Sequence, residues 1–192
     1  MLGLINSRKR TATKAAHRIY DTIVDVSRQP VFFGECRIPD TLEGRFEVLT
    51  LHAGLVVNRL SKADMGREGT LLAQCLFDVM FKNLDWSLRE MGVGDLAVPR
   101  RIKALMSAFK GRSFAYDEAV RSGRGEIKHA LIRNLYGTVK DSHNDELEQM
   151  TSYLQHCVDT LNRQGLSDFY LGKLSFPDFY DCNRRRYDQQ AA

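Results

Sequence analysis

The residues best placed to do chemistry form a charged stripe on one predicted helix, at about residues 70–91. Asp78, Lys82, Asp85 and Arg89 follow one another at spacings of four, three and four, so opposite charges on one side of a helix can pair. Each such pair stabilises a helix by only about 0.2 to 0.5 kcal/mol, so helix stability gives weak reason for the arrangement. Two interpretations stay open, a solvated ladder of ion pairs and a polar docking face.

A metal site could combine His52 with the carboxylates of Asp78, Asp85, Glu90 or Asp95, because helical bundles bind metals through inward-facing side chains of these types. His52, however, has no second histidine four residues away, and the remaining histidines fall on other predicted helices. The chain also lacks the Gly-x-Ser-x-Gly, His-Glu-x-x-His and phosphate-binding glycine motifs of common enzyme classes. We therefore predict no metal, no cofactor and no catalytic activity.

Two clusters of basic residues could attract anionic partners. They are Arg8, Lys9, Arg10 and Lys14 near the start of the chain, and Arg100, Arg101 and Lys103 in its middle. Phosphate groups of anionic lipid or of RNA suit such clusters, although a solvated basic face is the other interpretation. The formal net charge of +4 and the pI of about 8.9 permit these partners without requiring them.

The elements that must position these residues are helices, because apolar residues recur at helical spacing and no strand-like alternation persists. With 43% hydrophobic and 27% charged residues, the 192-residue chain predicts an all-α, single-domain bundle. We expect this domain to span residues 1–182, with a mobile basic segment at 1–10 and a flexible tail at 183–192. The six predicted helices cover about residues 8–28, 40–60, 70–91, 99–119, 126–136 and 144–162.

Local signals mark where these helices begin and end. Asp40 followed by Glu43 resembles a capping box, which predicts a helix start at Asp40. Gly44 is anomalous in a first turn, so either another backbone packs against it or the helix begins later. Gly92 has the position of a left-handed C-terminal cap on the third helix, whose wide apolar face predicts a central place in the bundle. Gly111 predicts an interruption of the fourth helix.

The cysteines and the apolar runs bound the setting of the chain. Cys75 and Cys157 lie within apolar helical patterns, where a free thiol behaves as a small buried hydrophobe, so a reducing compartment is expected. No run approaches the roughly 20 apolar residues that span a bilayer, and no secretory signal is recognisable. We expect a cytoplasmic protein or one on the cytoplasmic face of the inner membrane, which corresponds to the matrix side in an organelle.

The chain closely resembles the ubiquinol-cytochrome c chaperone family over about residues 19–136. The resemblance is carried by IPDTLEGRF at residues 38–46, by His52 and Arg59, and by LFDVMFKNLDWSLREMGVGDLAVPRRIKALMSAFKGRSFAY at residues 76–116. It implies a non-enzymatic assembly factor of bacterial type, which binds newly made cytochrome b and promotes assembly of ubiquinol-cytochrome c reductase. The mitochondrial members work with a small partner protein near the ribosomal exit, and no DNA partner is implied.

The site hypothesis joins this resemblance to the charge pattern. We expect the surfaces around residues 40–46 and 85–95 to bind the client or a partner, while the two basic clusters contact the membrane or the ribosome. Arg45 and Arg89 would offer planar donors to a carboxylate. The residues predicted for partner binding are Asp40, Gly44, Arg45, Phe46, His52, Asp85, Arg89, Glu90, Gly92 and Asp95. The alternative is a basic helical module that binds ribosome, RNA or an anionic membrane without a cytochrome b client.

Overall fold

The computed structural model describes residues 2–137 and 144–190, and the side chains of residues 7–137 and 144–184. Within these ranges the secondary structure is helical and contains no strand, which confirms the predicted all-α class. The six predicted helices correspond to α1 (Leu2–Ser27), α3 (Leu42–Leu60), α4 (Gly66–Glu90), α5 (Val98–Ser122), α6 (Arg124–Leu135) and α7 (Asn144–Arg163). Shorter or later elements are α2 (Pro30–Phe33), the 3-10 turn η1 (Ala63–Met65), α8 (Leu166–Leu171) and α9 (Phe179–Gln190).

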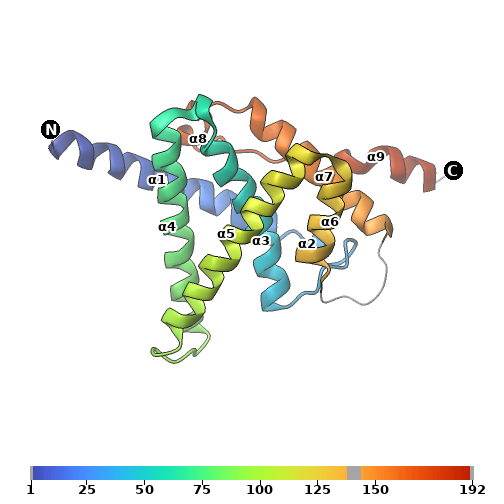
Figure 1. Ribbon diagram of the computed structural model, residues 1–192, viewed down its shortest axis with the longest axis horizontal. Coiled ribbons are helices and arrows are strands. Elements are labelled where there is room, and N and C mark those ends of the chain that lie inside the picture. The colour runs from blue at the N-terminus through green and yellow to red at the C-terminus, as the bar shows by residue number, and fades with distance from the viewer. Residues whose placement is uncertain (1, 138–143, 191–192) are drawn as a thin grey trace.

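Helix α3 lies at the centre of the fold, where it contacts α1, α4, α5, α6 and α7 (Figure 1). Its middle segment is buried on every side, because it is apolar around nearly its whole circumference from Leu51 to Val56. The prediction that the third helix, α4, would be central was therefore wrong. Helix α4 instead packs against α1, α3 and α5 and leaves one flank, with Asp78 and Lys82, in solvent.

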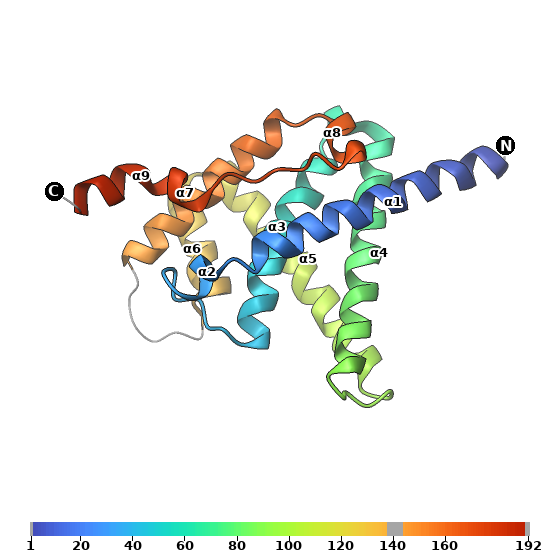
Figure 2. The same ribbon diagram turned by 180° about the vertical axis from the view of Figure 1, so that it is seen from behind.

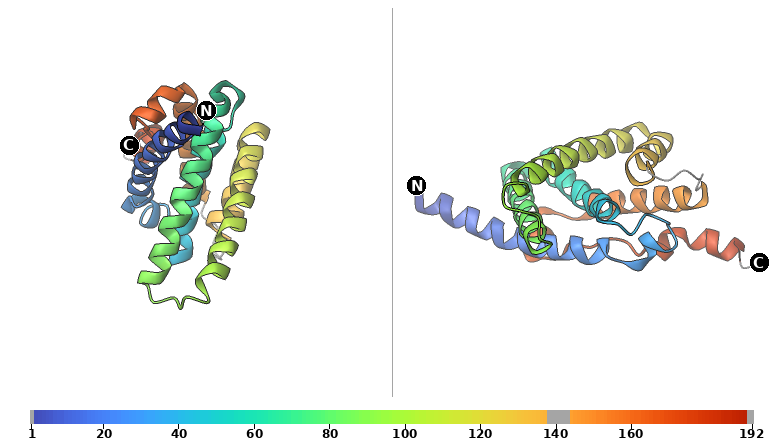
Figure 3. Two further views of the ribbon diagram at one scale, coloured as in Figure 1. Left: turned by 90° about the vertical axis from the view of Figure 1, so that its left-hand side faces the viewer. Right: turned by 90° about the horizontal axis from the view of Figure 1, so that it is seen from below.

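Helices α4 and α5 form a long antiparallel hairpin whose loop end projects away from the other helices (Figures 1 and 3). Gly92 closes α4 with a φ of +79°, which confirms the predicted left-handed cap. Helix α5 runs without a break through Gly111, so the predicted interruption there was wrong. The small cost of a helix-interior glycine is offset because Phe109 and Tyr116, on either side of it, are buried in the core.

The start of α3 depends on Thr41 and not on the predicted capping box. The hydroxyl of Thr41 accepts a hydrogen bond from the Gly44 backbone N–H at 3.1 Å, whereas the Asp40 carboxylate binds Arg45. A Cβ atom on Gly44 would lie 1.9 Å from the Pro39 carbonyl oxygen. The first alternative for Gly44, close packing of another backbone, is therefore confirmed.

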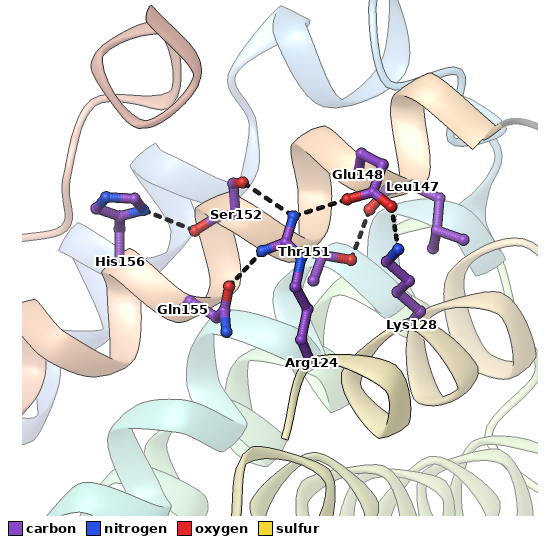
Figure 4. A network of polar contacts seen from close by, with 8 residues as sticks. All are labelled: Arg124, Lys128, Leu147, Glu148, Thr151, Ser152, Gln155 and His156. Atoms are coloured by element: carbon purple, nitrogen blue, oxygen red, sulfur yellow. Dashed lines mark hydrogen bonds and ion pairs between the residues drawn. The ribbon is translucent and has the colours of Figure 1, made fainter. Parts of the chain in front are cut away.

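Hydrogen bonds and ion pairs hold α7 against α6 and α3. Glu148 of α7 accepts hydrogen bonds from Lys128 and Arg124 of α6 (Figure 4), and these bonds lower the pKa of the Glu148 carboxyl. Arg59 at the end of α3 donates to the Leu161 carbonyl at 3.0 Å and to the Gln164 carbonyl at 3.1 Å. These bonds fix the last turn of α7 and its following residues beside α3.

The two ends of the chain extend the predicted helices. Helix α1 begins at Leu2 rather than at about Arg8, and its first turns project beyond the body of the molecule (Figure 2). From α8 the chain runs back along α1 to α9, which continues to Gln190 and buries Phe179 in the core. Residues 1, 191 and 192 lie outside the described residues, and the mobility predicted for 1–10 and 183–192 stays a prediction. Cys75 and Cys157 are buried free thiols, as predicted.

Candidate functional site

An apolar groove of about 470 Å³ lies between the first turns of α3, the end of α4 and the first half of α5. The first turns of α3 and the loop end of the hairpin lie on the same side of the molecule (Figure 1). Leu42 and Met91 line the groove and are 53% and 54% exposed, which is high for side chains of this size. The lining residues are Leu42, Glu43, Phe46, Glu47, Leu84, Ser87, Leu88, Met91, Arg101, Ala104, Leu105, Ala108 and Arg112.

A partly buried ion pair lies among the polar residues of this groove. Arg112 of α5 donates through Nε to the Glu47 carboxylate of α3, and Glu47 is only 9% exposed. Burial raises the pKa of the Glu47 carboxyl, although the hydrogen bond and the charge of Arg112 oppose this. The pair fixes α5 against α3 and leaves the apolar side chains of Leu42 and Met91 as the accessible surface. Such a groove can bind an apolar segment.

Of the four predicted site residues around the start of α3, one lines the groove and three lie outside its lining. Phe46 lines the groove, and Gly44 is buried behind it against Pro39. Arg45 and Asp40 form a two-point ion pair on the outside, with Nε to Oδ1 at 2.5 Å and Nη2 to Oδ2 at 3.0 Å. The Arg45 guanidinium also lies over the ring of Phe33. The donors predicted for a partner's carboxylate are therefore partly used within the chain.

The predicted site residues at the end of α4 gather at the hairpin loop but do not line the groove. Arg89 donates to Asp85 at 2.7 Å and to Asp95 at 2.5 Å, which ties the loop to the last turn of α4. The hydrogen bond to Asp85, together with the charges of both aspartates, raises the pKa of Arg89. Glu90 and Gly92 are exposed beside this clip. The expected pairing of Arg89 with nearby acids is thus present.

His52 lies in the core and not on the surface with the other predicted site residues. Its ring is 0% exposed, and Nε2 lies 2.9 Å from the Tyr153 hydroxyl while Nδ1 lies 2.8 Å from the Val48 carbonyl oxygen. Burial lowers the pKa of His52 to about 4. A contact between this ring and a partner is not possible without opening the core, so the position of His52 indicates a structural role.

The potential metal ligands and the two basic clusters predicted from the sequence do not come together at one site. The described residues contain no group of three or more side chains placed to hold a metal ion. One Glu-x-x-His sequence is present, but Glu126 and His129 form only an exposed pair on α6 with 3.5 Å between Nδ1 and Oε1. The basic cluster from Arg8 to Lys14 lies near the free end of α1, whereas the cluster from Arg100 to Lys103 lies near the hairpin loop (Figure 3). The structure keeps these two clusters apart.

The sequence interpretation missed most of the groove. Leu42 fits the apolar spacing of α3, and no local signal distinguishes a half-exposed first-turn leucine from a buried one. Glu47 and Arg112 are 65 residues apart, so their pairing depends on how α3 and α5 pack. A sequence signal that points to the groove is the pair of small residues Ala104 and Ala108 on α5, one turn apart, which both line it.

Comparison with known proteins places these features in one family. The family described as "Ubiquinol-cytochrome C chaperone" matches residues 34–176, which include every residue that lines the groove. The ubiquinol-cytochrome-c reductase complex assembly factor 1 of Xenopus laevis is 28% identical over 155 residues, 79% of this chain and 76% of that protein. The mitochondrial protein CBP3 of Saccharomyces cerevisiae is 27% identical over 147 residues, 76% of this chain and 44% of that protein.

The fold is also found in a solved structure. The crystal structure of the Cbp3 homolog from Brucella abortus superposes with a TM-score of 0.78 and 32% sequence identity, and the match covers 93% of this chain and 98% of that one. In the part of the chain that the structure describes, no helix is long and apolar enough to cross a membrane. The family match and the shared fold together show that the chain belongs to the ubiquinol-cytochrome c chaperone family.

Proposed function

We propose that this chain is a non-enzymatic assembly factor of ubiquinol-cytochrome c reductase and that its client is newly made cytochrome b. The observation that carries the proposal is the family match over residues 34–176. The relatives from Xenopus laevis and other animals are named as assembly factors of this complex. The chain spans about half of the mouse relative and less than half of the yeast one, so the client and the partners belong to the proposal.

The groove supplies the surface that such a client needs. Cytochrome b is an apolar membrane protein, and a segment that has not yet entered the bilayer must cover apolar side chains. Leu42 on α3 and Met91 at the end of α4 offer exposed apolar surface in the groove. Fully burying a leucine or methionine side chain is worth about 1.5 to 3 kcal/mol, and about half of this is available at each position because each side chain is already about half buried. The groove therefore gains free energy by binding an apolar client segment, and the Glu47–Arg112 ion pair joins its α3 and α5 walls.

The predicted polar residues would act around this apolar surface. The Asp40–Arg45 pair lies beside the first turns of α3, and the Arg89 clip holds the loop that contains Gly92. We propose that these groups form the polar rim of the client site. In this arrangement Arg45 and Arg89 are positioned by their own acids and keep further N–H groups for a client carboxylate or carbonyl.

The test is client capture by groove variants of the tagged, full-length chain. Leu42→Glu and Met91→Glu each place a charge in the groove and should reduce recovered cytochrome b about tenfold, measured by mass spectrometry and by the b-type haem spectrum. Leu171→Glu is the matched control, because Leu171 is 63% exposed on α8, and it should capture cytochrome b like the parent chain. All three positions are more than half exposed, so thermal unfolding should change little.

The result that contradicts the proposal is equally specific. If both groove variants recover as much cytochrome b as the parent, the client does not bind in this groove. If the parent chain recovers no cytochrome b but retains RNA in a salt-sensitive manner, the basic helical module is the better description and the assembly function must be withdrawn for this chain.

A further inference from the structure

The loop end of the α4–α5 hairpin carries an unusual amount of exposed apolar surface. This end projects from the other helices, so the rest of the molecule does not prevent it from contacting an extended, flat surface (Figures 1 and 3). Leu96, in the loop, is 98% exposed, and Trp86, four residues before the end of α4, is 62% exposed. Met91 adds a third large apolar side chain at the same end. Leu96 adds nothing to the core, and it lies at the same end of the hairpin as two other exposed apolar side chains.

Three basic residues, here called the basic collar, follow this apolar end in the first turns of α5. Arg100, Arg101 and Lys103 are exposed in the first turns of α5, and their side chains form no ion pair among the described residues. The nearby acids Asp85 and Asp95 are both bound by Arg89, so their charge is partly neutralised, and the three cations of α5 outnumber Glu90, the exposed acid beside this clip. An exposed apolar apex with a basic collar is the pattern of a segment that enters the interface of an anionic bilayer.

The backbone of the loop is suited to that environment. The N–H of Gly92 donates to the Arg89 carbonyl at 2.9 Å, that of Val93 to Leu88 at 3.0 Å, and that of Ala97 to Gly94 at 2.8 Å. Because unpaired backbone groups are costly to remove from water, these internal bonds lower the cost of placing the loop against lipid. Asp95 is a salt-bridged but exposed carboxylate, which limits the loop to the headgroup region and prevents deep insertion.

We propose that the hairpin loop docks on the surface of an anionic phospholipid bilayer, with Leu96 entering the interface and Arg100 and Lys103 contacting lipid phosphates. The groove opens beside this loop, so docking would bring it close to the membrane surface. The proposal does not depend on cytochrome b being the client, because it rests only on the exposed apolar side chains and the basic residues of the hairpin end. The alternatives are an anionic polymer such as RNA and contact through the basic segment of α1.

The chain contains its own probe for this contact, because Trp86 is its single tryptophan. It lies about 6 Å along α4 from the last helical residue, which keeps its ring near the interface when the loop is docked. The full-length chain should sediment with phosphatidylcholine vesicles that contain phosphatidylglycerol and remain in solution with phosphatidylcholine alone. On binding, the emission of Trp86 should shift to shorter wavelength and become quenchable by brominated lipid.

Two pairs of variants test the apolar and the basic parts separately. Leu96→Ser should weaken vesicle binding about tenfold, and the double variant Arg100→Gln with Lys103→Gln should weaken it about twentyfold. The matched controls are Leu171→Ser on α8 and the double variant Arg163→Gln with Lys173→Gln, which remove another exposed leucine and the same charge elsewhere. Both controls should bind vesicles like the parent chain.

Three results would overturn the proposal. The first is that Leu96→Ser binds vesicles as tightly as the parent and the emission of Trp86 does not move, because the surface would then be a simple polyanion site. The second is that binding follows Arg8→Gln and Lys9→Gln instead of the loop variants, which would assign the contact to α1. The third is that the parent chain binds no anionic vesicles at all. Because no cytochrome b is present in this assay, none of these results bears on the proposed client.

Discussion

Replacing His52 by glutamine should remove a pH-dependent part of the free energy of unfolding. In the folded chain the Val48 carbonyl oxygen can only accept a hydrogen bond, so Nδ1 of His52 carries the proton, and Nε2 accepts from the Tyr153 hydroxyl. The rings of Phe32 and Phe176 pack edge-on against the imidazole at centroid distances of 5.3 and 5.2 Å. A protonated ring would place a charge in these apolar surroundings, which is why the neutral form is favoured.

The expected magnitude follows from the pKa of His52 in the two states. Burial lowers this pKa to about 4 in the folded chain, while the unfolded chain has the ordinary value of 6.5. Between these values the unfolded state binds more protons than the folded state, so stability is fully present above pH 6.5 and is lost as the pH falls toward 4. The two pKa values predict that protonation of His52 lowers the free energy of unfolding by about 2.5 kcal/mol when the pH falls from about 7.5 to about 4.5.

Urea unfolding of the parent, of His52→Gln and of His17→Gln at several pH values measures this contribution. The parent should be more stable than His52→Gln by about 1 to 3 kcal/mol near pH 7.5, because glutamine cannot reproduce both hydrogen bonds. That difference should fall by about 2.5 kcal/mol by pH 4.5. His17 is exposed on α1, so His17→Gln should follow the parent across the range. If the difference between parent and His52→Gln does not change with pH, the ring is not desolvated and the argument is wrong.

Two further substitutions test how the ends of α3 are held. Gly44→Ala should destabilise the chain by about 1 to 3 kcal/mol, since its Cβ would meet the Pro39 carbonyl oxygen. The control Gly111→Ala has open space for its Cβ and should be neutral or stabilise the chain by up to about 1 kcal/mol. Denaturant titration would contradict the close-packing argument if the two variants behaved alike. Arg59→Lys should lower stability by about 2 to 4 kcal/mol and loosen the end of α7, because a lysine cannot bind the Leu161 carbonyl and Asp64 together. Amide hydrogen exchange at the end of α7 would refute this role if it stayed as slow as in the parent.

The helices were predictable because their signals are local. Apolar periodicity located α3 to α7, and Gly92 marked the end of α4, since each depends on residues within a turn or two. The errors also have local causes. Asp40 was predicted to cap the start of α3, but its carboxylate instead accepts a hydrogen bond from Arg45. The capping hydrogen bond is made by the Thr41 hydroxyl. Gly111 was given too much weight, because burial of the residues on either side outweighs its helix penalty.

The family resemblance rested on two stretches of sequence, and the structure shows why they belong together. Leu42, Glu43 and Phe46 of the first stretch line one wall of the groove, and residues 84–91 and 101–112 of the second supply the other walls. Their nearness could not be read from either stretch alone. The sequence also indicated that Arg89 would be held by acids, and the contacts with Asp85 and Asp95 are present.

By itself, then, the sequence determined the helical class, most helix limits and the family, because these depend on local spacing and on runs of matching residues. The tertiary structure decided which polar residues reach the surface. His52 lies off the apolar stripe of α3 and would be exposed on a helix with neighbours on one side, but α3 is surrounded by five helices and every side of its middle is buried. The Glu47–Arg112 pair and the groove arise in the same way, because only the packing of α5 against α3 brings residues 65 positions apart into contact.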